Sequence, residues 1–129
     1  MTTLTDQSTR RRWVGRIVTA LPVLFLIFDL SIKLAHIQPV TDAFAKLGIP
    51  DDLAVTIGVL ELLCLVVYLI PRTAVLGAIL CTGFLGGAIM IHVRIGDPLF
   101  SHILFPVYVG GLLWLGLYLR DPRIRTLIS

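Results

Sequence analysis

The sequence predicts an all-α integral membrane protein, built as an antiparallel bundle of four transmembrane helices. Hydrophobic residues make up 57% of the 129 residues and charged residues only 15%, whereas soluble domains have about 25% charged residues. Four apolar runs are long enough to span a bilayer, since about 30 Å of hydrocarbon requires roughly 17 to 25 helical residues. Because these runs lack the alternating pattern of barrel strands, we expect them to be helices.

The four expected helices belong to a single domain that begins at residue 13. They cover residues 13–34, 53–70, 73–95 and 99–119. The first run follows three arginines, as a secretory signal would, but it is too long for a signal core and no small-residue cleavage site follows it. We therefore expect it to remain as a membrane helix, with residues 1–12 as a loose, polar cytoplasmic tail and residues 13–129 as the membrane domain.

The connections between the runs predict which helices are neighbours. Only Pro71 and Arg72 separate the second run from the third, and residues 96–98 separate the third from the fourth, so both pairs should be antiparallel hairpins. The longer connection, residues 38–50, carries apolar residues at helical spacing, namely Val40, Phe44 and Leu47. We expect a short interfacial helix there, over the outer mouth of the bundle and between the first and second membrane helices.

The basic residues predict the orientation. Of the 11 lysines and arginines, eight lie on one side of the bundle: Arg10, Arg11, Arg12, Arg16, Arg72, Arg120, Arg123 and Arg125. The other three, Lys33, Lys46 and Arg94, lie on the opposite side. Because positive charge is retained on the cytoplasmic side, both termini should be cytoplasmic. The net charge of +3 therefore reflects topology, and we do not expect binding to nucleic acid.

Ionisable residues gather in the outer half of the predicted bundle. Glu61 is the only charged residue of the second run and lies at its middle, where a lone carboxyl costs about 2.5 to 3.5 kcal/mol and should face protein, water or a ligand. Asp29 and Lys33 share one face of the first helix. The 1.5 Å rise per residue puts His92 and His102 at matching depths on the third and fourth helices. We therefore expect a polar pocket in this half.

Two interpretations of the acidic residues stay open. Glu61 is either a neutral carboxyl that hydrogen-bonds between helices, or a proton donor and acceptor with Asp29 as the second catalytic acid. Asp29 and Lys33 are either an i,i+4 ion pair in which Lys33 extends to the outer surface, or part of the functional site. The second interpretation in each case makes Glu61 and Asp29 candidate catalytic residues.

The remaining polar residues suggest a ligand site without a metal. Lys33, His92, Arg94, His102 and Tyr108 are candidate ligand-binding residues, and a quinone head group would suit them because it accepts hydrogen bonds from such side chains. No His-x-x-His, Glu-x-x-His or three-ligand cluster is found in the sequence, so we expect no metal site.

Small residues are expected to have structural roles. Gly83 and Gly87 form a G-x-x-x-G pair, which predicts a close helix contact, either within the chain or between two copies. Cys64 and Cys81 lack the Cys-x-x-Cys spacing of thiol oxidoreductases, and we expect them to be small buried hydrophobic residues.

Residues spread over nearly the whole chain carry a resemblance to a known family. They are Phe28, Lys33 and Leu34; Leu47, Gly48 and Pro50; Gly58 with Glu61; Pro71, Gly77 and Ala78; Gly86, Gly87, Ala88 and His92; and Gly96, Pro98, Pro106, Tyr108, Trp114, Arg120 and Asp121. In order and spacing they resemble the DoxX-like family of small membrane proteins. The resemblance implies a four-helix protein of the bacterial inner membrane, in which Glu61 and His92 match the acid on the second helix and the polar residue ending the third.

The resemblance also implies a function. Founding members are similar to the small membrane subunit of a thiosulfate:quinone oxidoreductase, so the chain is expected to be a quinone-associated or partner-binding subunit linked to redox metabolism. It would bind a lipophilic small molecule and assemble with an oxidoreductase subunit or with copies of itself. Since no flavin or nucleotide motif is present, electron transfer would need such a partner or a bound quinone. The alternative is a stand-alone intramembrane enzyme, in which Glu61 and Asp29 act on an apolar epoxide, isoprenoid or sterol-like substrate.

Overall fold

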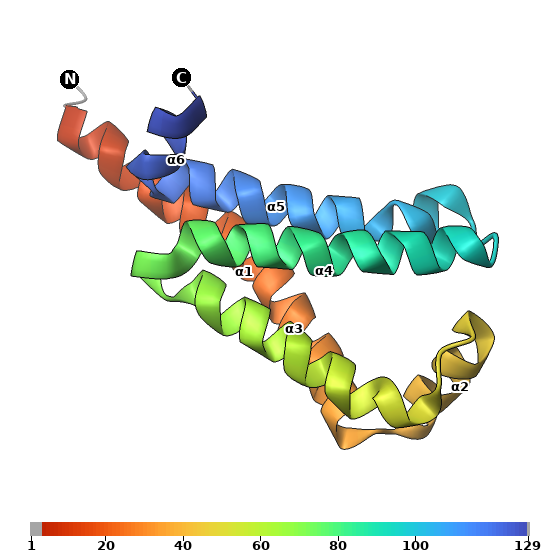
Figure 1. Ribbon diagram of the computed structural model, residues 1–129. Helices are drawn as coiled ribbons and strands as arrows, with labels where there is room; N and C mark the ends of the chain where they lie inside the picture. Colours follow the sequence, from red (N-terminus) through yellow and green to blue (C-terminus); the bar gives the residue numbers. More distant parts are fainter. Residues whose placement is uncertain (1–3, 129) are drawn as a thin grey trace.

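A computed structural model describes residues 4–128 and confirms the all-α fold class (Figure 1). The four long helices are α1 (Leu4–Ala35), α3 (Ala54–Leu69), α4 (Ala74–Arg94) and α5 (Phe105–Arg120). Two shorter helices are α2 (Gln38–Leu47) and α6 (Pro122–Ile128). Single helical turns precede three of the long helices, namely η1 (Asp51–Leu53), η2 (Pro71–Thr73) and the π-helical η3 (Leu99–Ile103). Residues 4–128 contain no strand.

The helices have the length and surface of a multi-pass membrane protein. Four stretches are long and apolar enough to cross a bilayer: Gln7–Ala35, Asp51–Leu69, Pro71–Arg94 and Leu99–Arg120. Only 28% of each apolar window is buried inside the molecule, so most of its hydrophobic side chains face outward. Such an extensive apolar surface matches lipid and not water, which confirms the predicted bilayer environment.

The four long helices pack as a ring in which each has two neighbours. Helix α1 packs against α3 and α5, and α4 packs against the same two helices. The predicted hairpins are confirmed, because α3 turns into α4 through η2 and α4 turns into α5 through η3. Figure 1 shows α3 and α4 close together near η2 and separating toward the end where α2 lies.

Close backbone contacts hold the η2 end of the bundle together. A Cβ on Gly77 would lie 2.2 Å from backbone atoms of Tyr68, and a Cβ on Gly116 would lie 2.0 Å from the Thr19 hydroxyl, so only glycine fits at either position. The Tyr68 hydroxyl donates to the Leu113 carbonyl across the core at 2.6 Å. The main core cluster, including Leu65, Tyr68, Leu113 and Leu117, lies among these helices.

The predicted short helix between the first two membrane helices is confirmed as α2. Its two buried residues, Val40 and Phe44, form a second small core with Ala54 at the start of α3. The helix ends at Gly48, whose φ of 74° is the left-handed conformation that favours glycine. The hydrophobic core is therefore divided into a large part near η2 and a small part under α2.

The ends of two helices differ from the prediction. Helix α1 begins at Leu4, so the expectation of a loose tail is wrong for residues 4–12, because this stretch has no proline or glycine to end the helix and α1 continues through it. Residues 1–3 of the expected tail lie outside the described residues. The fourth run is not one regular helix, because a π-helical turn, η3, precedes α5, which begins at Phe105. Pro106 has no backbone N–H to donate, so it fits the first turn of a new helix better than the interior of a continuous one. Helix α6 was not predicted.

Candidate functional site

Lys33 is the centre of a charged cluster between α1 and α3. Its Nζ lies 2.6 Å from Oδ2 of Asp29, one turn earlier on α1, and 2.9 Å from Oε1 of Glu61 on α3. Gly58, almost one turn before Glu61, lets the two helices approach, because a Cβ there would lie 3.2 Å from Cβ of Lys33 and 3.1 Å from a methyl group of Leu34. The small size of Gly58 therefore allows Lys33 of α1 to contact Glu61 of α3.

The cluster becomes more buried from Asp29 to Glu61. The side chains of Asp29, Lys33 and Glu61 are 27%, 16% and 2% exposed. The second carboxyl oxygen of Glu61, Oε2, is buried and accepts no hydrogen bond from the described residues. Two carboxylates around one ammonium carry one excess negative charge, which is unfavourable in a low-dielectric interior. The excess charge favours a further donor near Asp29, which is the more exposed of the two carboxyls and lines the adjoining cavity.

The predicted ion pair between Asp29 and Lys33 is confirmed, but the predicted direction of Lys33 is wrong. Lys33 does not extend to the outer surface, because Glu61 offers a second carboxyl inside the bundle. The ring of Phe84 on α4 adds a further attraction, with Nζ 5.4 Å from the ring centroid. Lys33 thus contacts side chains of α1, α3 and α4.

A cavity of about 530 Å³ adjoins the charged cluster. Its polar lining consists of Asp29, Lys33 and His92, and the rest is almost entirely apolar. Helix α2 contributes one wall with Val40 and Phe44. The remaining walls come from α1, α3 and α4, through Ile32, Ile57, Phe84, Ala88 and Ile91. Glu61 does not line the cavity and lies behind Lys33.

Gly83 and Gly87 are part of the cavity wall. For each of them, no atom of the described chain lies within 4 Å of where a Cβ would be, beyond the helix itself and its chain neighbours. The predicted close contact within the chain is therefore wrong for this pair, and the close contacts are made by Gly77 and Gly116 instead. Both residues line the cavity, where the lack of a side chain widens it. A contact between two copies stays a prediction.

The two histidines meet at the α4 to α5 turn. Their ring centroids are 6.0 Å apart, but only His92 lines the cavity, while His102 is exposed and contacts Ser101. His92 Nδ1 is 2.5 Å from Oδ2 of Asp97, and this hydrogen bond lowers the pKa of Asp97. The described chain has no group of three or more His, Cys, Asp or Glu residues placed to hold a metal ion.

The structure does not bring Arg94 and Tyr108 into the cluster. Arg94 donates a hydrogen bond to the Leu47 carbonyl at the end of α2, so it ties α2 to the end of α4. Tyr108 is exposed on α5 and donates to the Phe100 carbonyl at 3.2 Å. Neither residue lines the cavity.

Sequence reasoning missed that α2 and the glycines of α4 form walls of a cavity. The missed lining residues include Val40, Phe44, Gly83, Phe84 and Gly87. The spacing of Val40 and Phe44 indicated an apolar face without indicating what it covers. The small-residue stripe on α4 is equally consistent with a helix contact and with an open space.

Fold and site together define a small four-helix, multi-pass membrane protein with a charged cluster beside an apolar cavity. The sequence profile of the DoxX-like family matches residues 17–116, and the chain belongs to this family. The matched region contains the whole charged cluster and the cavity lining. No curated protein and no solved structure matches the chain.

Proposed function

We propose that this protein binds a lipophilic small molecule with a polar head group in the cavity between α1, α2, α3 and α4. The observation that carries the proposal is a charged cluster at the wall of an otherwise apolar cavity of about 530 Å³. Small-molecule sites are typically apolar clefts of about 300 to 1,000 Å³ with a few polar groups. An ion pair that served only helix association would need no such space.

The lining supports a ligand with a hydrogen-bond acceptor at one end. The Lys33 ammonium has three donors, and two of them are directed to Asp29 and Glu61. The third N–H donor of Lys33 is available to a carbonyl oxygen of the ligand. His92 lines the same cavity and would supply a second polar contact. The tail would lie against Val40 and Phe44. A quinone has this chemistry, and we propose it as the ligand class.

Family membership gives this ligand a setting in redox metabolism. We propose that the chain is a quinone-associated subunit that works with an oxidoreductase partner or as a homo-oligomer. The open stripe at Gly83 and Gly87 can be covered by acyl chains of lipid, by a ligand or by another chain, and a ligand with a polar head group is favoured because Lys33 lines the same cavity. Affinity purification of the tagged protein with its partners tests this assembly.

The test of the ligand class compares two molecules that share a tail. Decylubiquinone and decylbenzene are titrated into the detergent-solubilised wild type and their dissociation constants measured by native mass spectrometry. We expect decylubiquinone to bind at least about tenfold more tightly, because a hydrogen bond to a charged group contributes about 1.5 to 3 kcal/mol. Equal affinity for the two molecules would reject recognition of a polar head group.

A second candidate function is acid–base catalysis on an apolar substrate. It is favoured by one observation, the two carboxyls of Asp29 and Glu61 around a single ammonium, with Oε2 of Glu61 free of a donor. In this candidate Asp29, which lines the cavity, would exchange a proton with the substrate, and Glu61 would act through the Lys33 ammonium. Asp29→Asn and Glu61→Gln should each abolish turnover of an epoxide or isoprenoid substrate in folded protein, and unchanged turnover in both amides rejects this candidate.

We also propose a location in the bacterial inner membrane with both termini cytoplasmic. The basic residues support it, because Arg12, Arg16, Arg72 and Arg120 lie at the same end of the bundle as the N-terminal part of α1 and α6, and positive charge is retained inside. A fluorescent-protein fusion at the C-terminus should be bright, and an alkaline phosphatase fusion at the same position should be inactive.

A further inference from the structure

A second cavity lies at the opposite end of the bundle and is lined by four arginines. Its volume is about 460 Å³. Arg12 and Arg16 come from α1, Arg120 ends α5 and Arg123 belongs to α6. We propose that this cavity binds a phosphate group, as carried by the head group of an anionic phospholipid.

The cavity lies at the ends of two membrane spans, where we expect lipid phosphates. One membrane span begins at Pro71 and another ends at Arg120, and both residues line the cavity. Trp13, on α1 beside Arg12, is 58% exposed, and the Arg16 guanidinium is 5.2 Å from its ring centroid. Exposed tryptophan is typical of the membrane interface. The arginines therefore lie at the level of the head groups.

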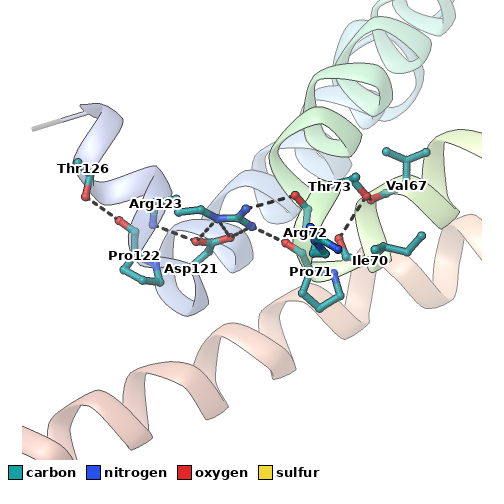
Figure 2. Close-up of polar contacts among 9 residues, drawn as sticks. All are labelled: Val67, Ile70, Pro71, Arg72, Thr73, Asp121, Pro122, Arg123 and Thr126. Carbon is teal, nitrogen blue, oxygen red and sulfur yellow. Dashed lines mark hydrogen bonds and ion pairs between the residues drawn. The ribbon is translucent and has the colours of Figure 1, made fainter.

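One arginine of the four is already occupied. Arg123 binds Asp121 through Nε at 3.1 Å and a terminal nitrogen at 2.7 Å. It also donates to the carbonyls of Pro71 and Arg72, as Figure 2 shows. The Arg123 hydrogen bond lowers the pKa of Asp121, which keeps this carboxylate ionised. Arg123 and Asp121 thus join α6 to the turn between α3 and α4.

The other three arginines carry positive charge without a carboxylate partner. Asp121 is the only acid among the described residues that line the cavity, and it is engaged by Arg123. Arg12 and Arg16 form no ion pair with any described carboxylate, and Arg120 attracts Asp121 only from beyond ion-pair distance. Four guanidinium groups around one space with a single carboxylate create a positive potential that favours an anion.

Arg120 is held in a fixed position with donor capacity to spare. Its Nε donates to the Thr19 hydroxyl at 3.2 Å, and its guanidinium lies 5.1 Å from the ring centroid of Tyr68. One terminal nitrogen is buried and has no acceptor among the described residues. A buried donor without an acceptor costs about 1 to 3 kcal/mol. A phosphate oxygen in the cavity would satisfy it once the guanidinium turns toward the cavity, and the planar guanidinium matches phosphate geometry.

The competing explanation is that these arginines only orient the protein in the membrane. Retention of positive charge requires arginines near the end of a span, but it requires neither a cavity nor a guanidinium fixed on Thr19 and Tyr68. The chain offers a matched control for this explanation. Arg10 and Arg11 belong to the same turns of α1 and carry the same charge, yet they do not line the cavity.

The experiment titrates the full-length protein in detergent and measures binding by native mass spectrometry. The probes are dioctanoyl phosphatidylglycerol, dioctanoylglycerol and inorganic phosphate. R12Q/R16Q is compared with R10Q/R11Q, and all four positions are exposed, so neither double variant removes a buried contact. We expect R12Q/R16Q to bind phosphatidylglycerol at least about tenfold more weakly, because a hydrogen bond to a charged group contributes about 1.5 to 3 kcal/mol. R10Q/R11Q should stay within about threefold of wild type, because Arg10 and Arg11 do not line the cavity.

Each outcome decides the proposal. Binding of phosphatidylglycerol without binding of inorganic phosphate supports a lipid head-group site, and competition by millimolar phosphate supports a site for the free anion as well. Equal losses in the two double variants overturn the proposal, because they show a general charge effect. Equal binding of dioctanoylglycerol, which has the same acyl chains and no phosphate, also overturns it.

Discussion

Lys33 on α1 binds Glu61, 28 residues further along the chain on α3, with 2.9 Å between Nζ and Oε1. This contact joins the two helices at the place where the apolar cavity begins. It also explains how a carboxyl that is 2% exposed is tolerated in the middle of a membrane helix, since intramembrane charges are usually paired. The same contact fixes the position of the ammonium that we propose for ligand binding.

Removing the ammonium should destabilise the bundle strongly. Lys33→Met leaves Asp29 and Glu61 as two buried carboxyls with no cation, and removing one partner of a buried ion pair costs about 3 to 5 kcal/mol. We expect a loss of about 3 kcal/mol in the free energy of unfolding, measured by titration with SDS in mixed micelles. Lys46 is an exposed lysine, so Lys46→Met should change the free energy of unfolding by less than about 0.5 kcal/mol. Equal effects of the two changes would contradict the buried cluster.

The tight packing near η2 gives a prediction about two glycines of α4. Gly77→Ala would place a Cβ 2.2 Å from the Tyr68 backbone and should separate α3 from α4, at a cost of about 1 to 3 kcal/mol. Gly83→Ala meets no described atom within 4 Å and should be neutral or stabilising by up to about 1 kcal/mol, because alanine favours helix. Thermal unfolding in detergent measures both, and a stable Gly77→Ala would contradict the hairpin geometry.

Arg94 should control the mobility of α2. It donates to the Leu47 carbonyl and so holds the C-terminal end of α2 against α4. In Arg94→Gln we expect amide hydrogen exchange in residues 38–48 to accelerate by about tenfold, the equivalent of one lost charged hydrogen bond. Exchange in α3 should stay unchanged. Lys46→Gln is the comparison, because Lys46 also links α2 to the turn after α4, through a longer ion pair of 4.0 Å with Asp97, and should accelerate exchange less. Unchanged exchange in Arg94→Gln would show that other contacts hold α2.

The pair of His92 and Asp97 should make stability depend on pH in the acid range. The hydrogen bond from His92 lowers the pKa of Asp97 below its ordinary value of 3.8. A carboxyl with a lower pKa in the folded state stabilises the fold above the unfolded pKa, and this contribution is lost as the pH falls through the folded value. The difference in Tm between wild type and Asp97→Asn should therefore be constant near pH 7 and shrink as the pH falls from 3.8 through the lower folded value. A difference that stays constant down to about pH 2 would contradict this assignment.

Much of the fold follows from hydrophobic length and periodicity. The four spans, the two hairpins and α2 were predicted from apolar runs, prolines and spacing, and the ion pair of Asp29 with Lys33 follows from helical phase. These features depend on residues close together in the chain. Helix α6 was missed because residues 122–128 form a short segment in which arginines interrupt the apolar residues, so that no apolar run reveals it.

The candidate site could be predicted only in part, because it depends on contacts between helices. Periodicity places Lys33 on a face but does not say which helix it meets, so its turn toward Glu61 was not foreseen. His36 follows the end of α1 with a φ of 54°, and its imidazole pairs with Asp51 at 2.8 Å, away from Lys33 and Glu61. The cavity lies where α3 and α4 separate and α2 supplies a further wall, a relationship that no local pattern encodes.

The most direct test of the proposed ligand site is native mass spectrometry, with an absorption spectrum, of gently purified wild type, Gly87→Leu and Gly86→Leu. Gly87 lines the cavity and Gly86, its neighbour on α4, does not. A Cβ added at either glycine would have no described atom within 4 Å, beyond the helix itself and its chain neighbours. We predict that wild type and Gly86→Leu retain a lipophilic molecule with the spectrum of a quinone and that Gly87→Leu loses it. If all three proteins carry the same molecules, or only ordinary phospholipid, the cavity is not a ligand site.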